Sequence, residues 1–154
     1  MMLLSKQEIV NLINDPATVK VLVTVDRQGV PHAVVKDSFW INAAGQLLYL
    51  ELLESSRTNK NMIASLWFEQ KVTIVLLGND GISYQIKGRP VKTHVSGPVF
   101  REQYVRIREK LGDTDLAAVW VIEPEEIINE SYTARRREEE DRHPYFKHLD
   151  RLAK

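Results

Sequence analysis

The stretch 47–61, LLYLELLESSRTNKN, decides how this chain folds, because an apolar run gives way within it to a polar segment. Residues 47–52 have the composition of a buried strand, and residues 62–67 (MIASLW) have that of a helix. The polar residues between them are therefore predicted to open a helix that runs from about Ser56 to Trp67.

This polar helix start has two interpretations. In the first it binds an anion, because free N–H groups and the positive end of the helix dipole favour a phosphate there. Arg57 would add a bidentate contact and Lys60 a point charge. In the second, a serine caps the helix and the first turn is simply solvated. Spacing alone leaves both interpretations open.

The rest of the chain reads mainly as strands joined by tight turns. Pro90 predicts an edge or a bend in its strand, and Pro124 is expected to end the last one. Glu125 and Glu126 are then expected in a solvated turn. The predicted strands are 20–26, 30–41, 46–52, 71–77, 82–94 and 117–123, with turns at 27–29, 42–45 and 78–81.

Helices are predicted on either side of these strands. Ser5 and Glu8 form a capping box for a helix over 4–14. A second amphipathic helix is predicted over 96–112. Residues 133–154 contain runs of Arg and Glu, and we expect them to form an appended, solvated tail.

Strands arranged in hairpins, with helices as separators, indicate one domain over 1–132. We predict a mostly β fold with flanking helices, built as a six-stranded antiparallel barrel. A Gly-rich dinucleotide fingerprint is absent from the sequence, which disfavours a doubly wound nucleotide-binding fold.

Composition narrows the classes of function. The chain has 154 residues, of which 44% are hydrophobic and 27% charged, as in a soluble globular domain. The chain has 21 basic residues (Lys and Arg) and 21 acidic residues (Asp and Glu), so its net charge does not favour binding to nucleic acid or anionic lipid. Cysteine is absent, which excludes thiol chemistry. Residues 1–4 (MMLL) lack the pattern of a signal peptide, and we expect a cytoplasmic protein.

Histidine and tryptophan give weaker signals. The four histidines have no spacing typical of a metal site, so no metal is predicted. No nucleophile elbow is present, and no catalytic residue can be assigned. Each tryptophan is most simply a core or dimer-interface residue, although one of them could flank a cofactor. The residues concerned are His32, His94, His143, His148, Trp40, Trp67 and Trp120.

Four short motifs, taken in their order along the chain, suggest a family. They are 30–36 (VPHAVVK), 48–50 (LYL), 56–62 (SRTNKNM) and 84–88 (YQIKG). Together they resemble the pyridoxamine 5'-phosphate oxidase-like FMN-binding split barrels, over about residues 20–129. The similarity is greatest to the small flavin-nucleotide-binding branch of that superfamily.

The resemblance implies a fold, a cofactor and a site. It implies a homodimer of six-stranded split barrels, with FMN in each of two grooves at the subunit interface. Lys36 and Arg57 would then hold the FMN phosphate, and Lys60 would be a second cation or point to water. The hydroxyls of Ser56 and Thr58 and the amide of Asn61 would complete the phosphate site. Ser83 and Gln85 would lie near the edge of the flavin ring.

The sequence also departs from the family pattern. The region 61–71 is about one helical turn longer than usual, and Arg135, Arg136 and Arg137 stand without the tryptophan-containing motif of the true oxidases. Pyridoxamine phosphate oxidation is therefore not expected. Three functions stay open: an FMN-dependent oxidoreductase with an unknown substrate or redox partner, a non-catalytic flavin-binding or electron-transfer protein, and the same barrel holding haem or a deazaflavin.

Overall fold

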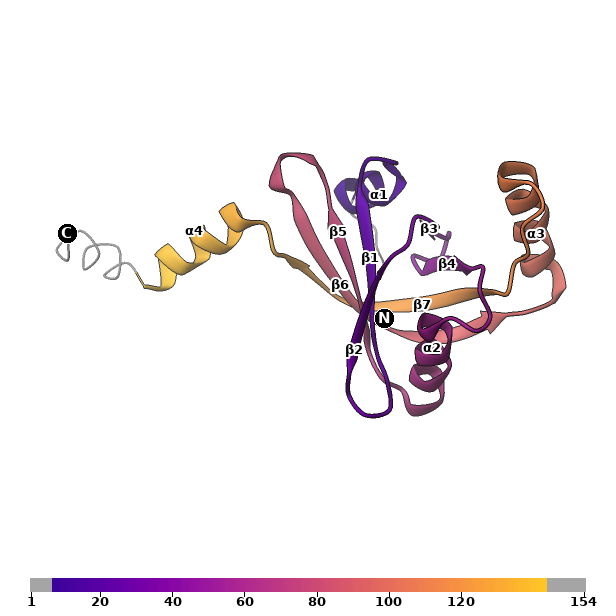
Figure 1. Ribbon diagram of the computed structural model, residues 1–154. Helices are drawn as coiled ribbons and strands as arrows, with labels where there is room; N and C mark the ends of the chain where they lie inside the picture. The colour runs from indigo at the N-terminus through magenta and orange to yellow at the C-terminus, as the bar shows by residue number, and fades with distance from the viewer. Residues whose placement is uncertain (1–6, 144–154) are drawn as a thin grey trace.

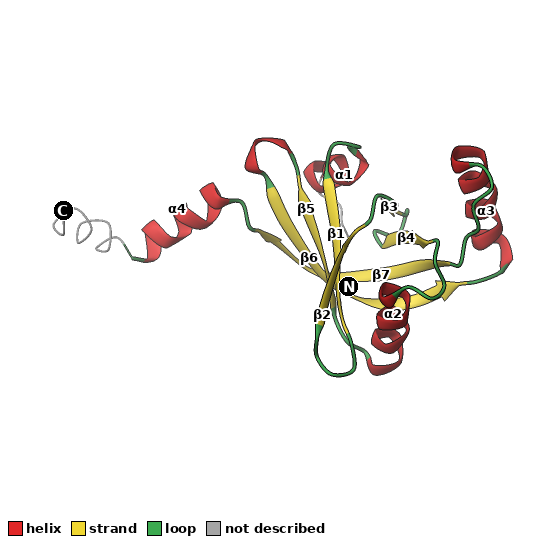
Figure 2. Cartoon of the chain, in the orientation of Figure 1, coloured by secondary structure: helices red, strands yellow, loops and turns green. Residues whose placement is uncertain are grey.

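The structure, a computed structural model, describes residues 7–143 (Figure 1). Seven strands form one sheet, and four α-helices lie around it, as Figure 2 shows. In chain order the elements are α1 (Gln7–Asn14), β1 (Val19–Val25), β2 (Pro31–Val35), β3 (Phe39–Ile41), β4 (Leu47–Glu51), α2 (Arg57–Phe68), β5 (Val72–Leu77), β6 (Ser83–His94), α3 (Gly97–Leu111), β7 (Ala118–Asn129) and α4 (Tyr132–Arg142), with a 3₁₀ turn at Asn79–Gly81.

The sheet is a half-barrel in which every pairing is antiparallel. Its strand order is β2-β1-β5-β6-β7-β4-β3, so β2 and β3 are the two edges. The predicted antiparallel split-barrel class is confirmed. The predicted number of six strands is wrong, because the expected strand 30–41 is divided into two.

The division lies at residues 36–38. Before it, Val35 pairs with Val21 of β1; after it, Phe39 pairs with Tyr49 of β4, at the opposite end of the sheet. Ser38 fixes the bend, because its hydroxyl donates to Leu50 O and accepts from Leu50 N at 3.1 and 3.2 Å. One continuous β-rich sequence therefore serves both edges of the sheet.

Alternation along the strands separates the inner face of the half-barrel from the outer face. In β1, Leu22 and Thr24 are buried, while Val23 between them is half-buried. The inner face is covered by α1, through Ile9 and Ile13, and by α2, through Met62. A smaller apolar cluster, containing Ile107, lies where α3 packs on the outer face of β4 and β7.

The strand β7 is longer than predicted. Pro124 does not end it, because Pro124 pairs with Gly88 at a bulge and the ladder continues to Asn129. Glu125 and Glu126 therefore lie within a strand, and the expected solvated turn is wrong. At the bulge the backbones come so close that a Cβ on Gly88 would lie 2.4 Å from the carbonyl oxygen of Glu123.

Other sequence expectations are met. Pro90 lies beyond the part of β6 that pairs with β5, so it occupies a section with β7 as a neighbour on one side, as an edge proline should. The helix α1 ends at Asn14, as predicted, but its capping residue Ser5 lies outside the described residues. The start of the predicted tail forms the solvated helix α4, which extends away from the sheet (Figure 1).

Candidate functional site

The helix start singled out by the sequence is capped by serine. Ser56 Oγ accepts a 3.0 Å hydrogen bond from Asn59 N, and the Ser56 backbone is extended (φ −63°, ψ 150°). The N-cap interpretation is therefore confirmed for Ser56. The same hydroxyl donates a 2.7 Å hydrogen bond to Glu51 Oε1, so it also belongs to a network outside the helix.

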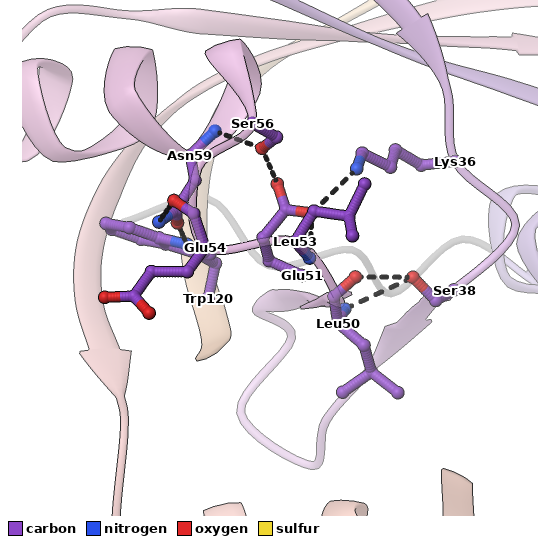
Figure 3. Close-up of polar contacts among 9 residues, drawn as sticks. All are labelled: Lys36, Ser38, Leu50, Glu51, Leu53, Glu54, Ser56, Asn59 and Trp120. Carbon is purple, nitrogen blue, oxygen red and sulfur yellow. Dashed lines mark hydrogen bonds and ion pairs between the residues drawn. The ribbon is translucent and has the colours of Figure 1, made fainter. Parts of the chain in front are cut away.

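Glu51 is the centre of that network (Figure 3). Its side chain is 1% exposed, and its Oε2 accepts from Lys36 Nζ at 3.1 Å and from Leu53 N at 3.4 Å. The two oxygens thus bind an ammonium, a hydroxyl and a backbone N–H. Three such donors offset the cost of burying a carboxylate.

Sequence reasoning missed Glu51. The available signal was an acidic residue within the apolar strand 47–52, two positions after Tyr49 and therefore on the same face of the strand. Lys36 also lies 5.8 Å from the Tyr49 ring centroid. Burial, followed by the charge of Glu51, raises the pKa of the Tyr49 phenol, so Tyr49 stays neutral beside the ion pair.

Two predicted site residues on α2 are buried against the barrel. Asn61 is 4% exposed, and its Nδ2 donates to Thr24 Oγ1 at 3.0 Å on β1. Thr58 is 2% exposed. Between them, Asn59 accepts from Trp120 Nε1 at 2.9 Å and donates to Glu54 O at 3.0 Å. These inward side chains connect α2 to the sheet.

The two predicted cations of α2 lie on its exposed side. Arg57 and Lys60 are exposed, and their spacing of three residues puts them on one helix face. The face continues along a cavity of about 400 Å³ beside α2. This α2 groove is lined by Asp26, Arg27, Gln28, Lys60, Asn61, Ile63, Ala64 and Trp67. It combines basic groups with an apolar wall that includes an exposed indole.

The predicted ring-edge residues lie on the other face of the sheet from Lys36. Gln85 pairs with Val75, which pairs with Val21, and this row is on the outer face. Ser83 lies on the same face, where its N–H donates to Ser131 Oγ at 2.9 Å. The structure of one chain therefore joins Lys36 and Ser56 but does not bring Ser83 or Gln85 to them.

A second cavity lies between α3 and the outer face of β4 and β7. Its volume is about 570 Å³, and Trp40, Lys92, His94, Gln103 and Arg106 are among the residues that line it. Burial, followed by the charge of Lys92, lowers the pKa of His94. This cavity is distinct from the α2 groove.

Residues 7–143 contain no group of three His, Cys, Asp or Glu side chains placed to bind a metal ion. Within the same residues, none of the helices has the length and apolar character needed to cross a membrane. The Arg-rich segment at 135–137 lies in α4, where Arg135 forms an ion pair with Glu138 and Arg136 forms one with Glu140.

Comparison of the sequence with known families finds no match, and no curated protein matches the chain. Solved structures do match. HupZ of group A Streptococcus superimposes with a TM-score of 0.69 at 22% identity, covering 86% of this chain and 96% of HupZ. An FMN-binding protein from Syntrophomonas wolfei superimposes with a TM-score of 0.65 at 17% identity, covering 79% of this chain and 83% of that protein.

A putative pyridoxamine 5'-phosphate oxidase from Lactobacillus delbrueckii gives a TM-score of 0.59 at 19% identity, covering 83% of this chain and 99% of its own. Proteins described as a haem storage protein, HutZ of Vibrio cholerae, and as an F420 reductase also share the fold, with TM-scores of 0.59 and 0.58. The resemblance seen in the sequence is thus confirmed at the level of fold. The descriptions of these proteins name different groups, namely FMN, haem and F420.

Proposed function

From the split-barrel fold that this chain shares with pyridoxamine 5'-phosphate oxidase-like proteins, we propose that it binds FMN and acts as a flavin-dependent oxidoreductase. One observation carries the proposal: the exposed cations Arg57 and Lys60 lie on one face of α2, and Lys60 also lines the α2 groove. A phosphate and an aromatic ring are the two parts of FMN that need a basic and an apolar surface side by side.

The residues of the chain fit the phosphate of FMN at the rim of the site. Arg57 can bind two phosphate oxygens at once, and Lys60 adds a second positive charge at the N-terminal turn of α2. The inner residues fit less well, since Lys36 and Ser56 already bind Glu51. We therefore assign the phosphate to Arg57 and Lys60, with Trp67 in the wall of the groove.

The outer face of the sheet supports a homodimer. Val21 pairs with Val35 on one side and with Val75 on the other, which makes a row of three valines across β2, β1 and β5. Val35 is 58% exposed, and the neighbouring pair Val19 and Leu77 is 41% and 46% exposed. An apolar sheet face of this kind is typical of a protein–protein contact, and we propose that a second copy covers it.

When bound, a flavin supplies hydride and one-electron transfer, so the protein need only bind and orient it. The substrate class is left open. We do not propose pyridoxamine phosphate oxidation, because Arg135 and Arg136 are paired with glutamates of their own helix.

The visible spectrum of the purified protein tests the cofactor directly. We expect a yellow protein with an FMN spectrum, or a colourless apoprotein whose tryptophan fluorescence falls when FMN is added. Parallel titrations with haem and with a deazaflavin are needed, since the fold accommodates other groups. Tight binding of haem or the deazaflavin without binding of FMN would replace the proposal.

Turnover separates an oxidoreductase from a flavin carrier. The FMN-loaded protein is mixed with NADH or NADPH and a panel of electron acceptors, and the absorbance of the flavin is followed. We expect reduction of the flavin by a nicotinamide and reoxidation by at least one acceptor. A flavin that binds but is reduced no faster than free FMN would indicate a carrier.

A further inference from the structure

The buried position of Glu51 has a consequence for the ligand. We propose that the Glu51 carboxylate is a built-in anion that fills the inner part of the anion site and so determines specificity. The inner anion site is defined by the donors that surround it, Lys36 Nζ, Ser56 Oγ and Leu53 N. A ligand phosphate is then confined to Arg57 and Lys60 outside it.

The donors around Glu51 are those that bind a phosphate ester. They comprise an ammonium at the end of β2, a hydroxyl at the N-cap of α2 and a backbone N–H in the loop between β4 and α2. Ammonium, hydroxyl and N–H groups converging near a helix N-terminus form an anion site in many proteins. Here an oxygen pair of the chain itself receives all three.

A role as a simple counter-ion of Lys36 does not account for this arrangement. Lys36 contacts one oxygen, Oε2, while Ser56 binds the other oxygen at the shortest distance in the network, 2.7 Å. The three donors come from two segments, the residue after β2 and the loop between β4 and α2, and Figure 3 shows them around one carboxylate. Glu51 therefore fills a site rather than neutralising one cation.

The filled site has an electrostatic effect. The charge of Lys36 is cancelled locally, and a phosphate dianion that approached the inner site would meet a carboxylate 1% exposed to water. Repulsion between like charges is strong where water is excluded. Phosphate binding in the inner anion site is therefore disfavoured by the Glu51 carboxylate, and the remaining preference for a phosphorylated ligand depends on Arg57 and Lys60.

Removal of the carboxylate tests this inference without a flavin. We expect inorganic phosphate, compared with chloride at matched ionic strength, to raise the unfolding temperature of Glu51→Ala, because phosphate replaces the missing anion. The phosphate affinity of Glu51→Ala should exceed that of wild type by at least about tenfold, the factor of one charge-assisted hydrogen bond. No phosphate effect in a folded Glu51→Ala would overturn the proposal.

Glu54→Ala is the matched control. Glu54 is an exposed acid three residues after Glu51, in the loop that follows β4, and its side chain points away from Glu51 in Figure 3. It should behave like wild type toward phosphate. An equal gain in Glu54→Ala would mean that general charge, and not occupancy of the inner anion site, controls anion binding.

Two further measurements guard against a variant that does not fold. Glu51→Gln keeps an oxygen for Ser56 and removes the charge, and it should gain phosphate affinity in the same direction. In the wild-type protein, phosphate added during an amide NMR titration should shift the first turn of α2 and leave the Leu53 N–H signal in place. A saturable phosphate shift at Leu53 in wild type would contradict the proposal.

The expected effect of Glu51 on FMN binding rests on the proposed function. Riboflavin lacks the phosphate, so the ratio of riboflavin to FMN dissociation constants reports the phosphate contribution. In Glu51→Gln this ratio should rise by about tenfold over wild type. If neither flavin binds any variant but phosphate still stabilises Glu51→Ala, the proposed function fails and the role of Glu51 stands. If FMN binds and Glu51→Gln leaves the ratio unchanged, the role of Glu51 fails alone.

Discussion

The indole Nε1 of Trp120 on β7 donates a 2.9 Å hydrogen bond to Oδ1 of Asn59 on α2, and both side chains are buried. Asn59 in turn donates to the backbone of Glu54 in the loop before the helix. The position of α2, and with it the exposed face of Arg57 and Lys60, is thereby tied to the core of the half-barrel.

Replacement of Asn59 by Ala should lower the free energy of unfolding by about 1–3 kcal/mol, because the Trp120 N–H is left buried without an acceptor. Urea denaturation measures the change. Lys60→Ala, an exposed position on the same helix, should change stability by less than about 0.5 kcal/mol. Equal effects at the two positions would show that the buried hydrogen bond is not what holds α2.

Gly88→Ala should be among the most destabilising single-methyl changes in the chain. The new Cβ would lie 2.4 Å from Glu123 O, and a backbone atom cannot move aside without disturbing the β6–β7 ladder. We expect a loss of about 3 kcal/mol or more. In Gly81→Ala the new Cβ would have no atom within 4 Å, and the only cost comes from the positive φ of residue 81. A loss of about 1 kcal/mol is expected there.

Arg57→Ala should weaken FMN binding by about 1.5–3 kcal/mol, the range of a hydrogen bond to a charged group. Isothermal titration of apoprotein with FMN gives the value. Arg101→Ala, which removes an exposed arginine of α3, controls for the loss of one positive charge. Unchanged FMN affinity in Arg57→Ala would remove Arg57 from the site.

A charge in the valine row should separate the proposed dimer. Val21→Glu places a carboxylate between Val35 and Val75, where a second copy would have to bury it. Light scattering at micromolar protein should give the mass of a dimer for wild type and of a monomer for Val21→Glu. Val105→Glu, at an exposed site on α3, should stay dimeric. A monomeric wild type with FMN bound would contradict the interface.

His94 should make stability depend on pH. Its pKa in the folded chain is lowered from the ordinary value of 6.5, so its contribution to stability is complete above pH 6.5 and is lost as the pH falls through the lowered value. His94→Gln should therefore flatten the decrease in unfolding free energy below pH 6.5, measured by urea denaturation. A slope below pH 6.5 that is the same in His94→Gln as in wild type would contradict this role of His94.

Most of the fold could be predicted from local sequence patterns. Alternation in 20–26 and 71–77, and turn residues between the strands, are short-range signals, and the structure has strands there. A serine cap for α2 was one of the two interpretations of its polar start, the other being an anion site. It could be considered from the sequence because a cap depends on residues within one turn. The bend at 36–38 was missed, since no Gly or Pro marks it and Ser38 fixes it through a bond to β4.

The site was less predictable than the fold. Arg57 and Lys60 are exposed as an anion-binding turn requires, whereas Thr58 and Asn61 face the barrel because helical periodicity turns them inward. Ser83 and Gln85 lie on the outer face of the sheet, opposite to the face of Lys36. Their part in cofactor binding stays a prediction.

By itself the sequence determined an antiparallel β domain with a helix after the strand that contains residues 47–51, because alternation and helix-start signals act between near neighbours. Only the tertiary structure decided that Lys36 pairs with Glu51. Lys36 and Glu51 are 15 residues apart, and they meet because the bend after β2 carries the chain to β4. A contact of that kind depends on strand register across the whole sheet, which no local pattern encodes.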